Sequence, residues 1–400
     1  MAPLVSVLLP TRNRLELLEQ AVATVRRQDD GDWELVVSDN DSEQDIAGYV
    51  ASLGDERIRY VRTPTFVPVT ENWNNALTHS TGRYVVMLGD DDGLMPGYVA
   101  RLRELVERYA RPDVIYTGAY VFAYPDVLPD EPAGYLQPYG YASFLRRRTK
   151  PFVLDPAVAR QVVSDAMHFR VSYGFNMQFS AISRRLVDEI ADRGPFYQSA
   201  FPDYYATNVA FLTARRIVAD PQPMVIIGVS PKSYGFFHAH GRNDAGKAFL
   251  GAVTDERARR RLEAAMLPGS NINAGWLSAI ESIWARYPDL APAPPDHRRF
   301  RLVQAIHAYE GRYLKGTVTE LDLAALEQHL RGWQRRLGRT VGRLLGHTRP
   351  ARLQWAISAA LRLAFVRQFP LWNPPKVRGH RTLLEVYEWA DRGGLRSTTV

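Results

Sequence analysis

The sequence predicts an α/β fold: a doubly wound, mostly parallel sheet flanked by helices, followed by a mainly α-helical C-terminal region. In the first half of the chain, short apolar runs alternate with amphipathic segments of helical spacing. Two of these runs end directly in acidic residues, at Asp39 and at Asp90. After about residue 250 this alternation stops, and helical segments with proline-rich breaks follow.

The composition is that of an ordinary globular protein. The 400 residues are 46% apolar and 23% charged, enough to bury a sizeable core. The chain has no cysteine, which excludes disulfides and thiolate metal sites. We find no secretory signal pattern and no run of 18 uncharged apolar residues. We therefore expect a cytoplasmic protein that does not span a membrane, with peripheral attachment to the inner face of the cell membrane as an open alternative.

The apolar runs predict the strands of the sheet. We expect two domains: a sheet-containing domain at 1–245 and a helical, basic region at 246–400. The predicted strands cover residues 4–9, 34–38, 58–61, 84–88, 114–117, 176–182 and 224–229. Helices are expected over 15–25, 46–53, 70–80, 96–109 and 155–167, from Ser183 as a cap, and from about residue 201. The proline- and glycine-rich stretch 124–150 predicts a long loop.

Three consecutive carboxylates, Asp90, Asp91 and Asp92, follow the strand predicted at 84–88. Ligands of open α/β sheets bind at the carboxyl ends of the strands, and the strand ending at Asp39 opens onto the same edge. Adjacent like charges repel one another, and a hard divalent cation would offset that repulsion. The alternative is a solvated acidic turn, because Asp-Asp-Gly is also common turn chemistry.

Two later segments carry further candidate residues. Asp203 lies in the predicted first turn of a helix, where the helix dipole favours a carboxylate; a simple capping role is the alternative. His238 and His240 lie in a glycine-containing loop after the last predicted strand, and such pairs are more often structural than metal-binding.

The basic charge is concentrated in the last third of the chain. Residues 251–400 hold 24 Lys and Arg against 13 Asp and Glu, and residues 330–383 hold 12 Lys and Arg and no acid. On a helical projection of 331–346, Trp333 and Leu337 share a side with other apolar residues while four arginines lie opposite. This pattern is typical of a helix at an anionic membrane surface. A helical bundle with a solvated arginine face is the alternative.

Four segments, in this order, resemble family-2 inverting glycosyltransferases with the GT-A fold. They are Val5-Ser-Val-Leu-Leu-Pro-Thr-Arg-Asn-Arg14, Val36-Val-Ser-Asp-Asn-Asp-Ser42, the run from Asn75 through Thr81-Gly-Arg-Tyr-Val-Val-Met-Leu-Gly-Asp-Asp-Asp-Gly93 to Pro96-Gly97, and Pro202-Asp-Tyr-Tyr205. The resemblance covers about residues 3–240, and it implies that the domain at 1–245 is the nucleotide-sugar-binding and catalytic domain. The sequence departs from the family's pattern twice: Gly89 stands at the first acid of the metal motif, and Pro202-Asp203 replaces a Glu-Asp pair.

The resemblance implies a metal-dependent transfer of a sugar from a nucleotide-diphosphate sugar to a hydroxyl acceptor, a glycan or a lipid-linked glycan, in the synthesis of a cell-surface polysaccharide or glycolipid. Asp203 would be the general base, Asp92 with Asp90 and His238 would hold Mn²⁺ or Mg²⁺, and His240 is the substitute for His238. Tyr204 and Tyr205 would lie on the acceptor side. The nucleotide-sugar would contact Pro10, Thr11, Arg12, Asp39, Asn75, Asp90 and Asp91.

Two other functions stay open at this point. A sugar-phosphate nucleotidyltransferase can use a similar sheet, but it normally has a glycine-rich basic loop after the first strand, and Pro10 to Arg14 contains no glycine. A nucleic-acid-binding protein would suit the arginine-rich end, but the chain has neither zinc-ligand spacing nor an RNA-binding aromatic motif, so we expect no nucleic-acid partner. A homo-oligomer is left open.

Overall fold

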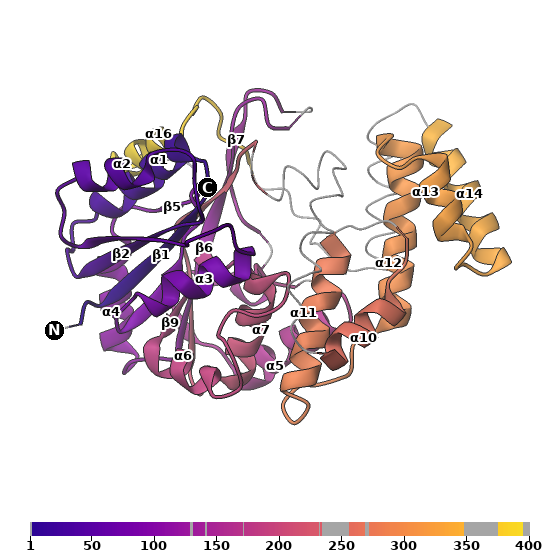
Figure 1. The fold of residues 1–400 in the computed structure, drawn as a ribbon, viewed down its shortest axis with the longest axis horizontal. Helices are drawn as coiled ribbons and strands as arrows, with labels where there is room; N and C mark the ends of the chain where they lie inside the picture. The colour runs from indigo at the N-terminus through magenta and orange to yellow at the C-terminus, as the bar shows by residue number, and fades with distance from the viewer. Residues whose placement is uncertain are drawn as a thin grey trace.

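The chain folds into a sheet-containing α/β part and a group of C-terminal helices beside it (Figure 1). The structure is a computed structural model, and it describes residues 2–128, 131–140, 142–170, 172–231, 233, 256–268, 272–347 and 375–394. The predicted metal contact His238, its substitute His240 and the apolar stretch 351–369 lie outside the described residues.

One mixed sheet organises the α/β part. Its path is β3-β2-β1-β4-β9-β6-β10-β5, with β7 paired to β6 and β8 to β10. The long ladders are parallel, and the antiparallel pairs are short. The strands are β1 (Val5–Thr11), β2 (Trp33–Asp39), β3 (Ile58–Arg62), β4 (Tyr84–Met87), β5 (Gly93–Leu94), β6 (Val114–Ala123), β7 (Tyr135–Pro138), β8 (Phe152–Val153), β9 (Ser180–Ser183) and β10 (Ile217–Val229). The predicted α/β class is confirmed.

Helices cover both faces of this sheet. Figure 1 shows α1 and α2 on one side of the sheet and α3 and α7 on the other. The helices of the α/β part are α1 (Leu15–Arg26), α2 (Ile46–Ser52), α3 (Val69–Thr78), α4 (Tyr98–Arg108), α5 (Pro156–Met167), α6 (Arg184–Ala191) and α7 (Pro202–Thr213), with the 3-10 turns η1 (Ser143–Leu145) and η2 (Met177–Phe179). Ser183 caps α6 as predicted, because its hydroxyl accepts a hydrogen bond from the Leu186 amide.

The predicted loop over 124–150 is partly regular. Strand β6 continues to Ala123, and β7 returns beside it at Tyr135–Pro138. The strand predicted at 176–182 is shorter than expected, since η2 occupies its first half and β9 its second. The last strand is longer than predicted, because β10 begins at Ile217 and bulges between Asp220 and Val225.

The first three C-terminal helices, α10 to α12, share the core of the α/β part. The C-terminal helices are α10 (Glu256–Ala265), α11 (Ile272–Arg286), α12 (His297–Glu310), the π-helical turn η3 (Gly311–Lys315), α13 (Glu320–Glu327) and α14 (Gly332–His347). Trp276 of α11 stacks on Tyr204 of α7 at 5.8 Å, and Phe300 of α12 packs on Phe169. One apolar core therefore runs from the sheet into α12. The two-domain division at residue 245 stays a prediction, and its boundary lies outside the described residues.

The end of the described chain returns to the sheet. Helix α16 (Leu383–Asp391) lies beside α1 (Figure 1), where the Tyr387 hydroxyl donates to the Arg27 carbonyl at 2.9 Å. The Leu383 amide donates to the Gln20 side chain at 2.9 Å, and Val377 pairs with Leu136 next to β7. We did not expect this return from the sequence, which predicted only a helical, basic C-terminal region.

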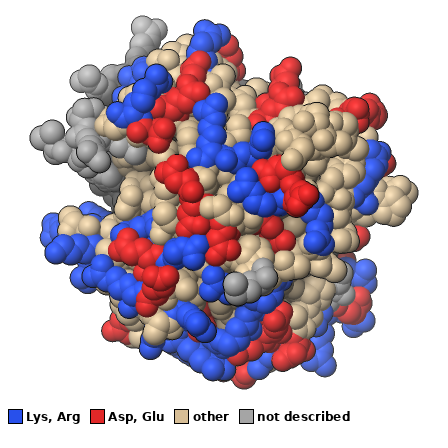
Figure 2. Space-filling model, turned by 90° about the vertical axis from the view of Figure 1, so that its left-hand side faces the viewer, with Lys and Arg blue, Asp and Glu red and all other residues tan. Residues whose placement is uncertain are grey.

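Acidic and basic side chains are intermixed on the surface of the α/β part (Figure 2). Many of these charges lie in short ion pairs, such as Arg103 with Asp30 at 2.7 Å. This agrees with the sequence, in which the basic surplus belongs to the last third of the chain. Among the helices that the structure describes, none combines the length and the hydropathy required to cross a bilayer.

Candidate functional site

The parallel register of β1, β2 and β4 brings their carboxyl ends together. Thr11 pairs with Asp39 across β1 and β2, and Leu8 pairs with Met87 across β1 and β4. The Thr11 hydroxyl donates to Asp90 at 2.8 Å. The predicted edge site is thus built from these strand ends, as expected for an open α/β sheet.

Each acid of the triplet has a separate set of partners. Asp90 accepts from Thr11 and forms an ion pair with Arg14 at 2.8 Å. Asp91 accepts from the Ser230 hydroxyl at 2.7 Å, at the end of β10. Both oxygens of Asp92 are occupied: one accepts from the Gly228 amide at 2.7 Å, and the other accepts from the Gly89 amide and the Gln178 side chain. The triplet therefore joins the loop after β1 to the end of β10.

The triplet carries more negative charge than its described neighbours balance. All three acids are buried, and among the described residues the ion pair of the triplet is that of Arg14 with Asp90. Burial, followed by the charge of Asp90, raises the pKa of Asp91 to about 6. Burial and the charge of Asp91 raise the pKa of Asp92 well above its ordinary value. A divalent cation would relieve this repulsion.

The residues fit Mn²⁺ or Mg²⁺ in kind, since both ions prefer carboxylate oxygens. The described side chains do not form a ready cluster of three ligands. Because Asp92 already accepts from two backbone amides and Gln178, only about one of its lone pairs is left for a metal ion. Asp90 offers the simpler exchange, in which the ion takes the place of the Arg14 guanidinium.

Asp39 lies at the same edge but is fully buried. Its carboxylate accepts from the Ser42 amide at 3.0 Å and from the Tyr60 hydroxyl at 2.7 Å. Arg62 completes its contacts at 3.3 Å. In this arrangement Asp39 holds the loop after β2 in place. A nucleotide contact would need one of these donors to move, and the assignment stays a prediction.

The other predicted nucleotide contacts surround Asp39. Asn75 donates to the Ser38 hydroxyl at 2.9 Å, and Pro10 and Arg12 lie at the end of β1. The Arg12 guanidinium lies 4.2 Å from the ring centre of Phe66, whose side chain is 57% exposed. Asn40 exchanges hydrogen bonds with the backbone of Val67 at 2.8 and 2.9 Å, which fixes this exposed ring in position.

Asp203 lies in the first turn of α7, as predicted. Its carboxylate accepts from the amide of the following residue, Tyr204, at 2.8 Å, and Phe201 rather than Asp203 stands at the cap. Burial raises the pKa of Asp203 to about 7. A carboxylate with this pKa can accept a proton near neutral pH.

The approach to α7 is anchored on α3. The Thr70 hydroxyl donates to the Ser199 carbonyl at 2.7 Å, and Asn74 exchanges hydrogen bonds with the backbone of Tyr197 at 2.8 and 3.2 Å. One turn into α7, Thr207 donates to the Phe175 carbonyl at 2.8 Å, just before η2. Gln178 of η2 then contacts Asp92. Through η2, α7 is connected to the acid triplet.

The prediction for Tyr204 and Tyr205 needs correction. Both rings are buried in the core, with exposures of 1% and 0%. Tyr204 packs between Phe175 and Trp276, with ring-centre distances of 4.8 and 5.8 Å. Tyr204 therefore joins α7 to α11, and the expected contact of either tyrosine with an acceptor is not compatible with its burial. The sequence alone does not indicate this burial, because a tyrosine with its polar hydroxyl can lie either at the surface or in the core.

Sequence reasoning missed the donors that hold the acids. Arg14 ends the first family-like segment, and the need to balance three carboxylates is a signal that predicts its pairing with one of them. Gln178, Gly228 and Ser230 come from distant segments with no sequence signal. Position 228 requires glycine for a steric reason, because a Cβ there would overlap the Asp91 carbonyl.

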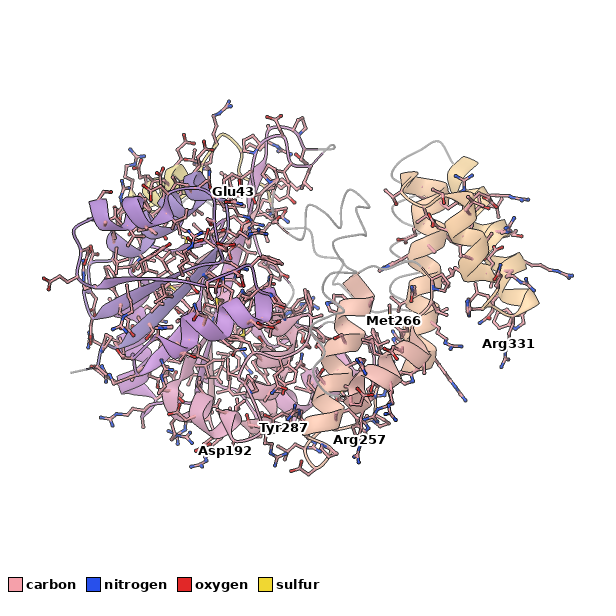
Figure 3. All side chains as sticks on the ribbon, in the orientation of Figure 1. Glu43, Asp192, Arg257, Met266, Tyr287 and Arg331 are labelled. Atoms are coloured by element: carbon pink, nitrogen blue, oxygen red, sulfur yellow. The ribbon has the colours of Figure 1, made fainter. Side chains whose placement is uncertain are left out.

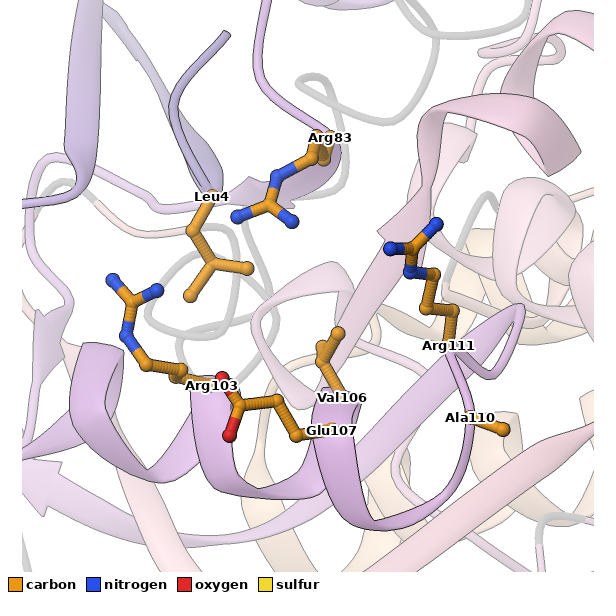
Figure 4. A pocket seen from close by; sticks show the side chains of 7 residues that line it. All are labelled: Leu4, Arg83, Arg103, Val106, Glu107, Ala110 and Arg111. Atoms are coloured by element: carbon orange, nitrogen blue, oxygen red, sulfur yellow. The ribbon is translucent and has the colours of Figure 1, made fainter. Parts of the chain in front are cut away.

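A cavity of about 340 Å³ lies at the other end of the sheet (Figure 4). Leu4 and Arg83 line it where β1 and β4 begin, and Arg103 and Glu107 line it from α4. Arg83 and Arg103 are already close to Asp32, at 3.5 and 3.0 Å. This cavity is separate from the acid triplet, which follows the carboxyl end of β4.

Together, the sheet and its acidic edge define an α/β domain with an oxygen-rich site at the strand ends. Residues 6–165 match the family model described as glycosyl transferase family 2. Over these residues the chain is similar to this family, in agreement with the resemblance found in the sequence.

Curated relatives show the same similarity. The chain is 37% identical over 105 residues to a GalNAc(5)-diNAcBac-PP-undecaprenol beta-1,3-glucosyltransferase of Campylobacter jejuni, covering 26% of this chain and 34% of that protein. It is 31% identical over 154 residues to the putative colanic acid biosynthesis glycosyl transferase WcaA of Escherichia coli, covering 36% of this chain and 53% of that protein. The matches thus span about a third to a half of the relatives' length.

Solved structures with distant similarity are also known. Residues 1–349 of Staphylococcus aureus TarS in complex with UDP-GlcNAc match with 13% identity and a TM-score of 0.47, over 95% of this chain and 97% of that one. The mannosyltransferase PcManGT of Pyrobaculum calidifontis, in complex with GDP-Man and Mn²⁺, matches with 18% identity and a TM-score of 0.42, over 92% and 89%. At these scores, neither structure supports an inference about ligands of this chain.

Proposed function

We propose that the chain is an inverting glycosyltransferase that moves a sugar from a nucleotide-diphosphate sugar to a hydroxyl acceptor. The observation that carries the proposal is the junction of the strand ends at Thr11, Asp39 and Asp90 in a domain similar to this family. Two relatives are named for undecaprenol-linked substrates: the Campylobacter jejuni glucosyltransferase and the UDP-Glc:alpha-D-GlcNAc-diphosphoundecaprenol beta-1,3-glucosyltransferase WfgD of Escherichia coli. We infer that the acceptor here is also a lipid-linked glycan, used at the inner face of the cell membrane.

Asp203 is the base in this proposal. An acceptor hydroxyl is a poor nucleophile, and its attack on the anomeric carbon needs a group that takes the proton. Asp203 can take it at neutral pH because its pKa is about 7. A single attack opposite the leaving group inverts the anomeric centre. The proton passes to Asp203, and the C–O bond to the nucleoside diphosphate breaks.

The acid triplet holds the donor in this proposal. Asp90, with Asp91 or Asp92, would bind Mn²⁺ or Mg²⁺, and His238 stays the predicted further contact. When bound, such an ion stabilises negative charge on the departing diphosphate. Arg14 would move from Asp90 to a diphosphate oxygen as the ion binds, so that the guanidinium keeps an anionic partner.

The proposal is tested with the full chain, a panel of nucleotide-sugars and Mn²⁺. We expect donor hydrolysis or transfer, lost in Asp92→Ala and strongly reduced in Asp90→Asn, which keeps the side-chain shape. Asp203→Asn should bind nucleoside diphosphate as the natural chain does and fail to transfer. Full activity of Asp92→Ala would exclude Asp92 as a metal ligand.

Product analysis of the same reaction mixtures distinguishes a glycosyltransferase from a nucleotidyltransferase. A nucleotidyltransferase releases pyrophosphate from a nucleoside triphosphate, whereas the proposed enzyme releases a nucleoside diphosphate from a nucleotide-sugar. Pyrophosphate release with no effect of an acceptor would overturn the proposed function. Binding to a generic DNA duplex that weakens with added salt would favour the nucleic-acid reading.

A further inference from the structure

Helix α14 exposes apolar side chains to water. Trp333, Leu337 and Leu344 are 61%, 56% and 66% exposed. At about 100° per residue, these positions lie within about 40° of one another on the helix surface. Large apolar side chains gathered on one exposed face usually mark an interaction site. We propose that this face of α14 docks on an anionic membrane surface.

The opposite face of α14 fixes its orientation. Gly338 and Gly342 lie directly against the rings of Tyr309 and Tyr313, and a Cβ at either glycine would overlap them. Arg339 pairs with Glu327 at 2.7 Å and with Glu320 at 3.2 Å. These contacts hold the glycine side of α14 on α12, η3 and α13. The apolar face therefore cannot turn inward without breaking them.

Basic side chains border the apolar face. Arg336 and Arg343 are exposed and lie along one edge of this face, about 60° to 80° from Trp333 and about 100° to 120° from Leu337 on the helix surface. Arg331 lies just before the helix, at the outer end of the molecule (Figure 3). Residues 330–383 contain 12 Lys and Arg and no acid. An apolar stripe bordered by arginine is the arrangement of helices that lie in the interface of anionic bilayers.

Charge complementarity favours an anionic membrane as the binding partner of this face of α14. A second copy of the chain, docked through the same face, would bring two arginine-bordered helices together, and their like charges would repel. A nucleic acid would suit the arginines but would leave the tryptophan and the leucines without an apolar partner. Anionic lipid satisfies both, because acyl chains accept the apolar stripe and headgroups accept the arginines. The inference does not depend on sugar transfer, since lipid binding needs no donor.

The test is flotation of the full chain with vesicles of phosphatidylcholine alone or with about 30% phosphatidylglycerol. We expect binding to the mixed vesicles, weakened several-fold by raising salt from about 0.1 to 0.5 M. The triple variant Trp333→Ser, Leu337→Ser, Leu344→Ser should lower the partition coefficient at least about tenfold. The variant Arg336→Gln, Arg343→Gln should lose the preference for the anionic lipid.

Leu321→Ser is the matched control. Leu321 is 83% exposed on neighbouring α13, but Glu320 and Asp322 flank it. Its substitution should leave flotation unchanged, and circular dichroism should show all variants folded. Equal flotation of the natural chain and the triple variant would overturn the proposal, as would the absence of binding to mixed vesicles. A dimer in solution that becomes a monomer in the triple variant would assign the face to a second copy instead.

Discussion

The charge state of Asp203 depends on the water that its carboxylate loses on folding. Burial raises its pKa to about 7, so the group is increasingly protonated below neutral pH. Transfer should fall about tenfold for each pH unit below 7, because the protonated acid cannot accept the acceptor's proton. A rate profile that stays flat down to pH 5 would contradict the assigned role.

The same pKa has a consequence for stability. The unfolded chain releases this proton near the ordinary value of 3.8, so Asp203 stabilises the folded state less as pH rises from about 4 to 7. The stability of Asp203→Asn relative to the natural chain should therefore be greater at pH 8 than at pH 4.5. Urea unfolding at both values measures this, with the exposed Asp192→Asn as the control, for which we expect no such difference.

Phe66 offers an exposed aromatic face beside the strand ends. The Arg12 guanidinium already lies 4.2 Å from the centre of its ring, and Asn40 holds the loop behind it by hydrogen bonds to the Val67 backbone. If a nucleobase stacks there, Phe66→Ala should weaken nucleoside diphosphate binding by about 1 to 3 kcal/mol. Phe66→Tyr keeps the ring face and should bind normally. Calorimetric titration measures the affinity of the natural chain and both variants for nucleoside diphosphate. Equal affinity of all three would show that the Phe66 ring does not contact the donor.

At the scale of elements, the strands of the α/β part were predictable because each carries its own apolar run. Residues 4–9 and 84–88 read as strands from sequence and form β1 and β4 with little change. The donors to Asp92 were not predictable, since Gln178 and Gly228 reach it only through tertiary packing. The outward orientation of α14 likewise depends on Tyr309 and Tyr313, which no pattern within α14 contains.

Helix α16 supports the acid loop from behind. Leu383 is fully buried, and a Cβ added to Gly93, next to Asp92, would come within 3.1 Å of it. Leu383→Ala should cost about 2 to 5 kcal/mol of unfolding free energy and weaken Mn²⁺-dependent donor binding. Leu384→Ala, at a half-buried position one residue along, is the control. Denaturant titration and donor titration of both variants distinguish lost support from general instability.

At the scale of the whole molecule, α11 joins the helical region to the helix that carries Asp203. Trp276 is 3% exposed and packs on both Tyr204 and Phe175. Because one core extends across this junction, we expect the sheet and α11 to unfold together. Trp276→Ala should lower the stability of that single transition by about 3 to 5 kcal/mol.

Trp284→Ala supplies the comparison for this prediction. Trp284 lies on the same helix and is only partly buried, so its loss should cost less. Calorimetry should show one shifted transition for Trp276→Ala. Two separate transitions in the natural chain, with only the second one shifted, would show that the helical region folds independently.

The return of α16 also bears on how the chain is made. Synthesis proceeds from the N-terminus, and domains begin to fold as they emerge. All of the acids at the sheet edge leave the ribosome long before Leu383, which lies behind Gly93, and before Tyr387, which fastens on Arg27. A nascent chain interrupted before residue 375 would carry every one of those carboxylates without the helix that backs them. Translation must therefore run past residue 387 before the acid loop has its full support.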